Sequence, residues 1–273
     1  MKRVLDFASV VLACGISAIL FPPVAGGAVS IIQHGHAATT DHTGATVTCA
    51  LTATGAGRNI IVGAVSSTSG ASAIAVSGVS DNQGNTYQLA PGSRGVYEYV
   101  ETEVWHSLGA VGGVTSLTVT FSGTPGYYRE CFVFEVAGAV TFDTAAKVDS
   151  GTCVANVCTG ASVTTATTTG FVLGIVGADP VDQNPLAGNE FVSGGDIGLN
   201  GSGAAASLVS STAASHRPAW HSDRDGQHFA FLYGGLPTMT WQFQCDAPID
   251  TFWVCARDGA FQVARKQISV TIN

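Results

Sequence analysis

The stretch SLTVTFSGTPGYYRECFVFEV (116–136) contains two different strand patterns on either side of a turn. In its first part, Leu117, Val119 and Phe121 alternate with threonine, which is typical of a strand with one buried and one wet face. The run CFVFEV (131–136) is almost continuously apolar, which favours a strand covered on both faces. Two stacked sheets produce both patterns, so this stretch predicts a sandwich.

Similar strand signals recur along the rest of the chain. Short β-branched runs are bounded by Gly, Pro, Asn and Ser, and no long stretch shows a helical period. We therefore expect an all-β fold, a two-sheet antiparallel β-sandwich of the jelly-roll kind. The expected strands cover residues 29–34, 46–52, 59–66, 74–81, 86–90, 96–108, 116–122, 130–137, 160–165, 170–178, 190–193, 205–211, 228–236, 239–244, 251–256 and 267–272.

Two halves of the chain resemble each other, which predicts an internal duplication. GRNIIVGAV (57–65) matches TGFVLGIV (169–176), and GNTY (84–87) matches GNEF (188–191). Further matches keep the same order: 103–108 with 230–236, 115–121 with 237–243, and 131–136 with 252–256. Because each half looks too thin to close a core alone, we expect one domain over 29–273. Its half-units would be about 29–140 and 160–273, with an insertion at about 194–227.

Composition excludes several classes of protein. Of the 273 residues, 34 are glycine and 11% are charged, and the formal net charge is −8. A disordered chain combines low hydrophobicity with high charge, and a nucleic-acid-binding protein carries a basic patch, so neither class fits. A coiled coil would be rich in Ala, Glu, Lys and Leu, whereas Lys2, Lys147 and Lys266 are the only lysines here.

The N-terminus has the pattern of a secretory signal peptide. Lys2 and Arg3 supply positive charge, residues 4–21 are mostly apolar, and small residues suit cleavage after Ala28. We expect removal of residues 1–28, no transmembrane segment in the mature protein, and a secreted or cell-surface location. The alternatives are a membrane anchor that is retained and a lipoprotein cleavage that leaves Cys14 lipidated.

Six cysteines remain after removal of that segment, and an even count in an exported protein favours disulfides. Local spacing favours the pairs Cys153–Cys158 and Cys245–Cys255, which would leave Cys49 with Cys131. Spacing alone does not decide the connectivity. The C-x-x-C spacing of a structural zinc site is absent from the sequence.

The segment HRPAWHSDRDGQH (216–228) concentrates unusual side chains at the end of the expected insertion. Imidazole and carboxylate groups together suit zinc, nickel or copper, so a divalent metal is the one cofactor that the sequence indicates. The candidate ligands are His216, His221, Asp223, Asp225 and His228. The alternatives are another binding role and a solvated loop without a ligand.

Two further sets of side chains have a functional and a structural interpretation. SDNQGNTY (80–87) has the residues of a tight turn and, alternatively, oxygen ligands for calcium, although the EF-hand spacing is missing. Trp220 in the polar insertion, with Tyr127 and Tyr128 after a Gly-Thr-Pro-Gly turn, is a candidate face for carbohydrate. Ordinary partial burial is the alternative for these aromatic residues.

Catalysis has little support in the sequence. The G-x-S-x-G motif that places the nucleophilic serine of many hydrolases is missing. No sequence motif for nucleotide binding occurs either. Glu101 and Glu103 share one face of an expected strand, as paired carboxyl groups of a glycosidase would. The same pair also fits a solvated strand edge that discourages aggregation.

The ordered motifs resemble those of a family of exported bacterial β-sandwich surface proteins. The matching pieces are GRNIIVGAV (57–65), VSDNQGNTY (79–87), EVWHSLGAVGG (103–113), TSLTVTFSG (115–123) and CFVFEVAGA (131–139), after a first strand that ends at Gln33. The resemblance implies an extracellular or surface β-sandwich and no established activity. The six cysteines and the 216–228 segment depart from the family pattern.

The sequence thus favours a structural, adhesive or self-associating surface protein without catalysis. Its expected partners are other copies of the chain or an extracellular polysaccharide, and not nucleic acid. The alternatives are a carbohydrate-binding module and, further off, a glycosidase or a metal-dependent hydrolase that uses residues 216–228.

Overall fold

The chain folds as an all-β protein in the computed structural model. The structure describes residues 4–6, 28–39, 43–68, 73–97, 99–126, 128–138, 140–151, 153–154, 157–165, 169–177, 181–185, 192–196, 203–211, 213–222, 226–235, 242–244, 249–257 and 263–271. Strands and turns, and no helix, make up these residues. Contacts divide the chain into two units, one of residues Gly27–Leu236 and one of Met1–Gly26 with Pro237–Asn273.

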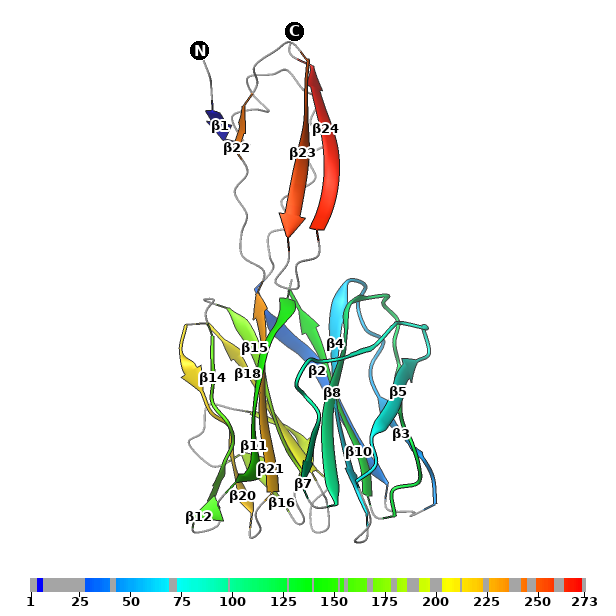
Figure 1. Ribbon diagram of the computed structural model, residues 1–273. Coiled ribbons are helices and arrows are strands. Elements are labelled where there is room, and N and C mark those ends of the chain that lie inside the picture. Colours follow the sequence, from blue (N-terminus) through cyan, green and yellow to red (C-terminus); the bar gives the residue numbers. More distant parts are fainter. Residues whose placement is uncertain are drawn as a thin grey trace. The chain divides into compact units, whose positions relative to one another are not determined.

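The first half of the larger unit is a jelly roll of two antiparallel sheets (Figure 1). Its larger sheet, called inner sheet 1, has the order β2-β10-β4-β8-β6, and β7 also pairs with β8. Its smaller sheet, called outer sheet 1, has the order β3-β9-β5. The strands are β2 (Ser30–Thr39), β3 (Thr46–Ala50), β4 (Arg58–Ser67), β5 (Val76–Asp81), β6 (Gln88–Leu89), β7 (Gly95–Tyr97), β8 (Val100–Ala110), β9 (Ser116–Phe121) and β10 (Tyr128–Ala137).

The second half repeats this plan. Its inner sheet 2 has the order β11-β21-β15-β18-β17, its outer sheet 2 the order β12-β13-β20-β16, and β14 pairs with β19. The strands are β11 (Val140–Gly151), β12 (Cys153–Val154), β13 (Val157–Thr159), β14 (Val163–Thr164), β15 (Gly170–Gly177), β16 (Val181–Pro185), β17 (Val192–Asp196), β18 (Gly203–Ser210), β19 (Ser215–His216), β20 (Ala219–Ser222) and β21 (Gly226–Gly235).

The strand order gives independent support to the predicted duplication. Numbered along the chain within each half, the strands of both inner sheets follow the order first, last, second, fourth, third. Strands β3-β9-β5 and β13-β20-β16 correspond in the same way. The match of 57–65 with 169–176 therefore pairs equivalent strands, β4 and β15. The match of 103–108 with 230–236 is wrong, because the equivalent of β8 is β18, and the equivalent of β10 is β21.

Three strand predictions need correction. The stretch 96–108 is a hairpin of β7 and β8 rather than one strand, since Tyr97 lies opposite Val100. Strand β11 was not expected, because VTFDTAAKVDSG (140–151) is rich in Ala, Asp and Lys and contains two register shifts. The supposed insertion at 194–227 supplies β18, β19 and β20, which are regular parts of the second jelly roll.

Three buried clusters hold the sheets of the larger unit together. One lies between inner sheet 1 and outer sheet 1 and includes Cys49, Val62 and Leu117. A second, which includes Val172 and Trp220, lies between inner sheet 2 and the strands outside it. The third joins the two inner sheets face to face and is described below. The expectation that neither half closes a core alone is therefore wrong.

The two strand patterns of the opening stretch occur as predicted. The side chains of β9 alternate between partly exposed and buried, because only one face of outer sheet 1 is covered. Every described residue of β10 is buried, because inner sheet 1 has a sheet on each face. Strands β4 and β15 are buried along their length for the same reason.

The inner sheets pack through β4 and β15 at the centre of their contact. Ile61 and Phe132 of inner sheet 1 share a buried cluster with Phe171, Leu173 and Ile175 of inner sheet 2. At the two ends of the contact, β2 lies against β17, and β7 lies against β11 and β21. The first strand of each half thus lies at one end of its own inner sheet and contacts the far end of the other inner sheet. Two identical subunits related by a two-fold axis show the same reciprocal pattern.

Glycines make this close contact possible. A Cβ atom on Gly63 would overlap Ile175 Cδ1, and one on Gly203 would lie 2.8 Å from Val65 Cγ2. A Cβ atom on Gly177 would lie 2.5 Å from Thr102 Oγ1. Many of the glycines in the sequence serve turns, but these three serve the contact between sheets, where no side chain fits.

The smaller unit contains two antiparallel pairs among its described residues. Strand β1 (Val4–Asp6) pairs with β22 (Gln242–Gln244). Strand β23 (Ile249–Arg257) pairs with β24 (Val263–Thr271) over its full length. Most of the predicted signal segment, including Cys14, lies outside the described residues. The boundary of the predicted single domain at 29–273 stays a prediction.

We predict that Gly177→Ala lowers the free energy of unfolding by about 1–3 kcal/mol, because the added methyl group overpacks the contact between the inner sheets. Urea denaturation at pH 7 measures the difference. Gly78→Ala is the matched control, since a Cβ atom there meets nothing within 4 Å. It should be neutral or stabilise by about 0.5–1 kcal/mol. Equal effects of the two substitutions would contradict the packing described for Gly177.

Candidate functional site

The predicted turn after β5 is built around the carboxylate of Asp81. Its Oδ1 accepts hydrogen bonds from the backbone N–H groups of Gln83 (2.8 Å) and Asn85 (3.2 Å). Its Oδ2 accepts from Asn85 Nδ2 and from Tyr87 Oη, both at 2.8 Å. Gly84 has a φ of 74°, a conformation that favours glycine. The side chain of Asp81 thus holds the turn with both of its oxygens.

This arrangement shifts two pKa values. Burial favours the neutral carboxyl group, but the hydrogen bonds from Asn85, Tyr87 and Gln83 outweigh it and hold the pKa of Asp81 below its ordinary value. Burial, followed by the hydrogen bond to Asp81 and its negative charge, raises the pKa of Tyr87. The charge of Asp81 is therefore stabilised by the fold itself.

The same turn is tied to the connection between β8 and β9. Asn85 Oδ1 accepts a hydrogen bond from the N–H of Val111 (2.7 Å). Asn82 Oδ1 accepts one from the N–H of Thr115 (2.9 Å). The polar residues of VSDNQGNTY therefore satisfy backbone groups of a neighbouring loop, which is why this motif needs Asp and Asn at those positions.

The remaining polar motif residues anchor the other side of the first jelly roll. Gln33 Nε2 donates to Thr52 O and to Glu135 Oε2, both at 2.7 Å. Glu135 Oε1 accepts from the N–H of Gly55 (2.9 Å). Asn59 Nδ2 donates to two backbone carbonyls around the end of β10 at 3.1 and 2.8 Å. The residues on which the family resemblance rests thus hold backbone segments together.

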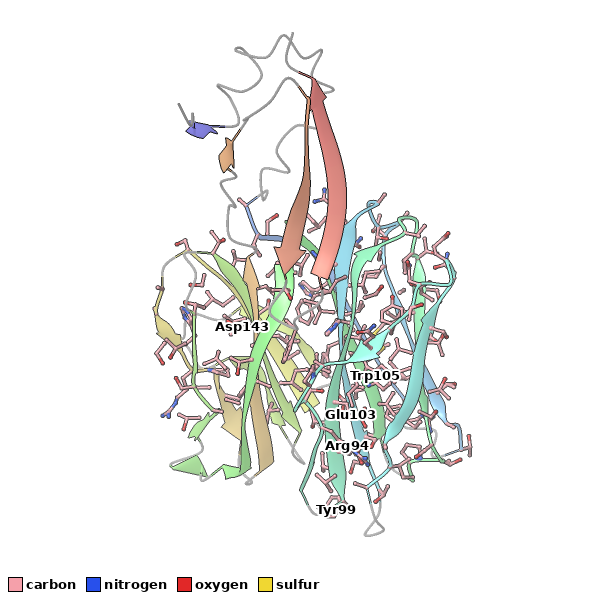
Figure 2. The ribbon with its side chains drawn as sticks, turned by 45° about the horizontal axis from the view of Figure 1, so that its top comes forward. Arg94, Tyr99, Glu103, Trp105 and Asp143 are labelled. Atoms are coloured by element: carbon pink, nitrogen blue, oxygen red, sulfur yellow. A yellow bond between two sulfur atoms is a disulfide. The ribbon has the colours of Figure 1, made fainter. Side chains whose placement is uncertain are left out.

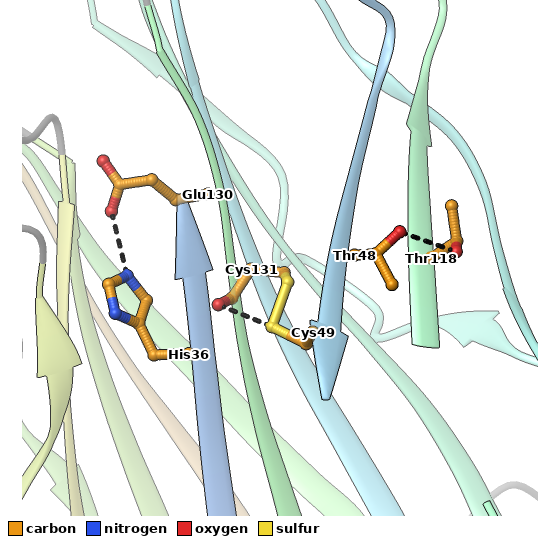
Figure 3. The surroundings of a disulfide bond; sticks show 6 residues. All are labelled: His36, Thr48, Cys49, Thr118, Glu130 and Cys131. Atoms are coloured by element: carbon orange, nitrogen blue, oxygen red, sulfur yellow. Dashed lines mark hydrogen bonds and ion pairs between the residues drawn. A yellow bond between two sulfur atoms is a disulfide. The ribbon is translucent and has the colours of Figure 1, made fainter. Parts of the chain in front are cut away.

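The predicted disulfide between Cys49 and Cys131 is present (Figure 3). It joins β3 of outer sheet 1 to β10 of inner sheet 1 across the buried cluster of the first half. Its two cysteines are 82 residues apart in the sequence. The cross-link therefore stabilises the fold by about 4–5 kcal/mol, because it lowers the conformational entropy of the unfolded chain.

The other two predicted disulfides are placed only in part. Cys153 of β12 lies directly opposite Cys158 of β13 in the strand register, as a pair across a tight hairpin would. Cys255 lies on β23, and Cys245 is outside the described residues. Both pairs stay predictions.

The three histidines among the predicted metal ligands lie on different strands. His216 is on β19, only 3% exposed, His221 is on β20 and His228 is on β21. Asp223 and Asp225 lie outside the described residues. Within the part of the chain that the structure describes, no three His, Cys, Asp or Glu residues form a metal-binding group. Metal binding at 216–228 therefore stays a prediction.

The expectation that Trp220 is exposed is wrong. Its exposed fraction is 0%, and it packs with Val172, Val176 and Ala206 in the core of the second half. A Cβ atom on Gly174 would lie 3.0 Å from Trp220 Cη2, so the missing side chain makes room for the indole ring. Polar neighbours in the sequence suggested a wet loop, but Trp220 lies on β20, a strand that pairs with both β13 and β16. Trp220 therefore presents no platform for a sugar.

The tyrosines proposed for the same face give it no support. Tyr128 is buried at the start of β10, and Tyr127 lies outside the described residues. Trp105, expected in the core, is partly buried against the cluster of the first half. Ligand binding by Trp220, Tyr127 and Tyr128 stays a prediction. The described residues of this set form no exposed aromatic surface.

The environment of Glu101 and Glu103 differs most from the one expected from the sequence. Both are only 2% exposed, so they do not form a solvated edge. Arg94 Nε lies 2.6 Å from Glu101 Oε1 and 3.7 Å from Glu103 Oε1. Trp105 Nε1 donates to Glu103 Oε2 (2.8 Å), and Val76 N donates to Glu103 Oε1 (3.0 Å). Figure 2 shows Arg94, Glu103 and Trp105 together along β8.

The two carboxyl groups share one guanidinium, since Arg94 Nε lies within 4 Å of an oxygen of each. Burial raises the pKa of Glu103 to about 7, and the hydrogen bond and charge of Glu101 add to the rise. The donors Trp105 and Val76 oppose it. A glycosidase keeps its carboxyl groups about 5 Å or more apart, with the sugar between them. Both carboxyl groups are only 2% exposed, so a sugar does not reach them, and the geometry does not support that reaction.

We predict that Asp81→Asn lowers the free energy of unfolding at pH 7 by about 2–3 kcal/mol, because charge-assisted hydrogen bonds are lost. The pKa of Asp81 is depressed in the folded state, so its contribution is present above the unfolded pKa and is lost as the pH falls. Urea denaturation at pH 7 and pH 3 should show the difference from wild type shrinking at the lower pH.

Asp143→Asn is the control for this prediction. Asp143 is exposed at the register shift in β11 (Figure 2), and its substitution should change stability by less than about 0.5 kcal/mol. A loss at Asp81 that is equally large at both pH values would contradict the role given to its charge.

Comparisons with known proteins found no relative of this chain. No family model matches the chain, and neither a curated protein nor a solved structure matches it. The geometry of the described residues therefore carries the functional argument.

Proposed function

We propose that the protein is exported and acts outside the cytoplasm, in the medium or at the cell surface, as a non-catalytic structural protein that associates with other copies of itself. The observation that carries this proposal is the use of the motif side chains. Asp81, Asn82, Asn85, Gln33 and Glu135 all hydrogen-bond to backbone or to one another within the fold. Because these side chains are used to hold the fold together, they favour a structural role over a catalytic one.

Two features support export. The N-terminal residues have the charge and hydrophobic pattern of a secretory signal. The buried disulfide between Cys49 and Cys131 suits an oxidising compartment, where such bonds form and persist. Among the described residues, no helix has the length and apolar character needed to cross a membrane.

The outer face of outer sheet 1 is the surface we propose for association. Thr46 lies opposite Thr120 in the strand register, and Thr48 lies opposite Thr118. The hydroxyl groups of Thr48 and Thr118 are 3.0 Å apart (Figure 3). The outward positions of β3 and β9 carry no charge. Natural sheets use charges, above all lysine, to prevent contact between copies, and this sheet has none at those positions.

Self-association is preferred to polysaccharide binding for a physical reason. Sugar-binding surfaces present exposed aromatic rings, and the tryptophan expected to supply one, Trp220, is buried. An uncharged threonine surface on a sheet matches another copy of itself in shape and in polarity. The polysaccharide partner is therefore the second choice.

Export is tested by expressing the full chain in a bacterial host and separating cytoplasm, periplasm and medium. We expect the protein outside the cytoplasm, with residues 1–28 removed and with a mass that rises on reduction by two hydrogens for each disulfide. Substitution of Lys2 and Arg3 by glutamate should retain the protein inside the cell. An intact chain that stays in the cytoplasm in both cases would contradict export.

Association is tested by light scattering during size-exclusion chromatography of the purified protein at increasing concentration. We expect dimers or larger species for wild type and a dissociation constant raised at least about tenfold by Thr48→Lys with Thr118→Lys, because like charges then face each other. Thr144→Lys, at an exposed position of β11 in the second half, is the matched control and should associate like wild type. A wild type that is monomeric at every concentration would contradict the proposal.

A further inference from the structure

The carboxyl pair on β8 joins three separate segments of the first jelly roll. Glu101 and Glu103 come from the first part of β8 and lie on the same face. Arg94, from the connection between β6 and β7, contacts both of them. Val76, the first residue of β5, donates its N–H to Glu103. The edge of outer sheet 1 and the turn before β7 are therefore both held to β8 by this cluster.

The cluster contains two buried carboxyl groups and one guanidinium. Glu103 uses both oxygens to accept from N–H donors, and Glu101 Oε1 accepts from Arg94. Glu101 Oε2 is buried and accepts no hydrogen bond from any N–H or O–H donor of the protein. With both groups ionised, two buried carboxylates would share the single guanidinium of Arg94, so a proton retained by the pair balances the charge of the cluster.

The surroundings add little charge to compensate for ionisation. Arg94 is 54% exposed, and solvent weakens its effect. Arg129 lies two strands away across Ser66 and bonds to the carbonyls of Gly44 and Thr46. On β5, the one titratable side chain is Asp81 at the far end, where it holds its own turn.

Other neighbouring segments hold few ionisable groups. The residues of β4 opposite the pair, Ala64 and Ser66, are neutral. The segment SGAS (69–72) before β5 has no ionisable side chain, and Glu98 lies outside the described residues. Ionisation of both carboxyl groups therefore leaves an excess negative charge within the cluster.

We propose that Glu101, Glu103 and Arg94 form a proton-dependent clasp, which holds the start of β5 and the turn before β7 on β8 while one proton is shared and loosens them when both carboxyl groups ionise. The inference is independent of the proposed function. It gives this exported chain a local opening at alkaline pH, next to the cluster that contains Trp105 and Val76.

The direction of the effect follows from linkage. The pKa of Glu103 is raised in the folded state, so its contribution to stability is present below the unfolded pKa and is lost as the pH rises through about 7. Only the segments held by the cluster lose protection at first, because the disulfide and the contact between the inner sheets involve other residues.

Hydrogen exchange with mass spectrometry on the whole protein, corrected for intrinsic rates, measures this opening. In wild type, protection of peptides that cover 76–80 and 93–97 should fall at least about tenfold between pH 5.5 and pH 8.5. In Glu101→Gln, the amide supplies a permanent N–H donor in place of the proton, so protection should stay nearly constant. Glu135→Gln, in a different buried cluster, is the matched control and should keep the wild-type pH dependence in these peptides.

A second variant, Arg94→Gln, tests the same proposal if Glu101→Gln does not fold. Arg94→Gln removes the one positive charge that favours ionisation, so the midpoint of the loss of protection should move to higher pH. Protection in wild type that is independent of pH would overturn the clasp. The same wild-type midpoint in Arg94→Gln, or the same pH dependence in Glu101→Gln, would overturn it as well.

Discussion

The contact between the two inner sheets is the constraint on which the rest of the structure depends. Each inner sheet has a second face covered by its own outer strands, so strands such as β4 and β15 are buried on both sides. Such strands carry no polar face, and their exposure in a separated half would be costly, since each buried aliphatic side chain contributes about 1.5–3 kcal/mol. The glycines Gly63, Gly177 and Gly203 allow the backbones to approach, and a substitution at any of them acts on both halves at once. The low charge of the chain follows from the same constraint, because much of the sheet surface is internal.

The duplicated plan also explains which surfaces remain for function. In each half, the inner sheet makes the contact with the other half, and solvent is faced by the outer strands, the loops and edge positions of the inner sheets such as Ile32 and Asp143. The first half presents an uncharged threonine face there, while its polar motif residues are occupied in holding turns and loops. The buried carboxyl pair beside β5 is a cluster of that half whose charge balance depends on a proton. The chain thus combines a stable scaffold with one edge whose order responds to pH.

Sequence reasoning predicted the fold class, the alternating and continuous strand patterns and the Cys49–Cys131 bond, because each depends on local residue type or on counting. It did not predict β11, whose Ala-, Asp- and Lys-containing sequence gains its strand conformation from pairing with β21. It offered Trp220 as a candidate exposed residue, with burial as the alternative, because its sequence neighbours are polar, whereas the side chain packs in the core of the second half. It gave Glu101 and Glu103 a wet environment, since no local signal shows that Arg94 and Val76 would be brought over them from other segments. Long-range pairing decided each of these cases.

Hydrogen exchange of the central strands tests the account most directly. If the two inner sheets form one core, the amides of 60–65 in β4 and of 171–176 in β15 should exchange only through the same global unfolding. Their opening free energies should then agree and fall together with increasing denaturant. Separate opening of one half, with β15 exchanging at lower denaturant while β4 stays protected, would contradict a shared core and would mean that the halves are independent domains.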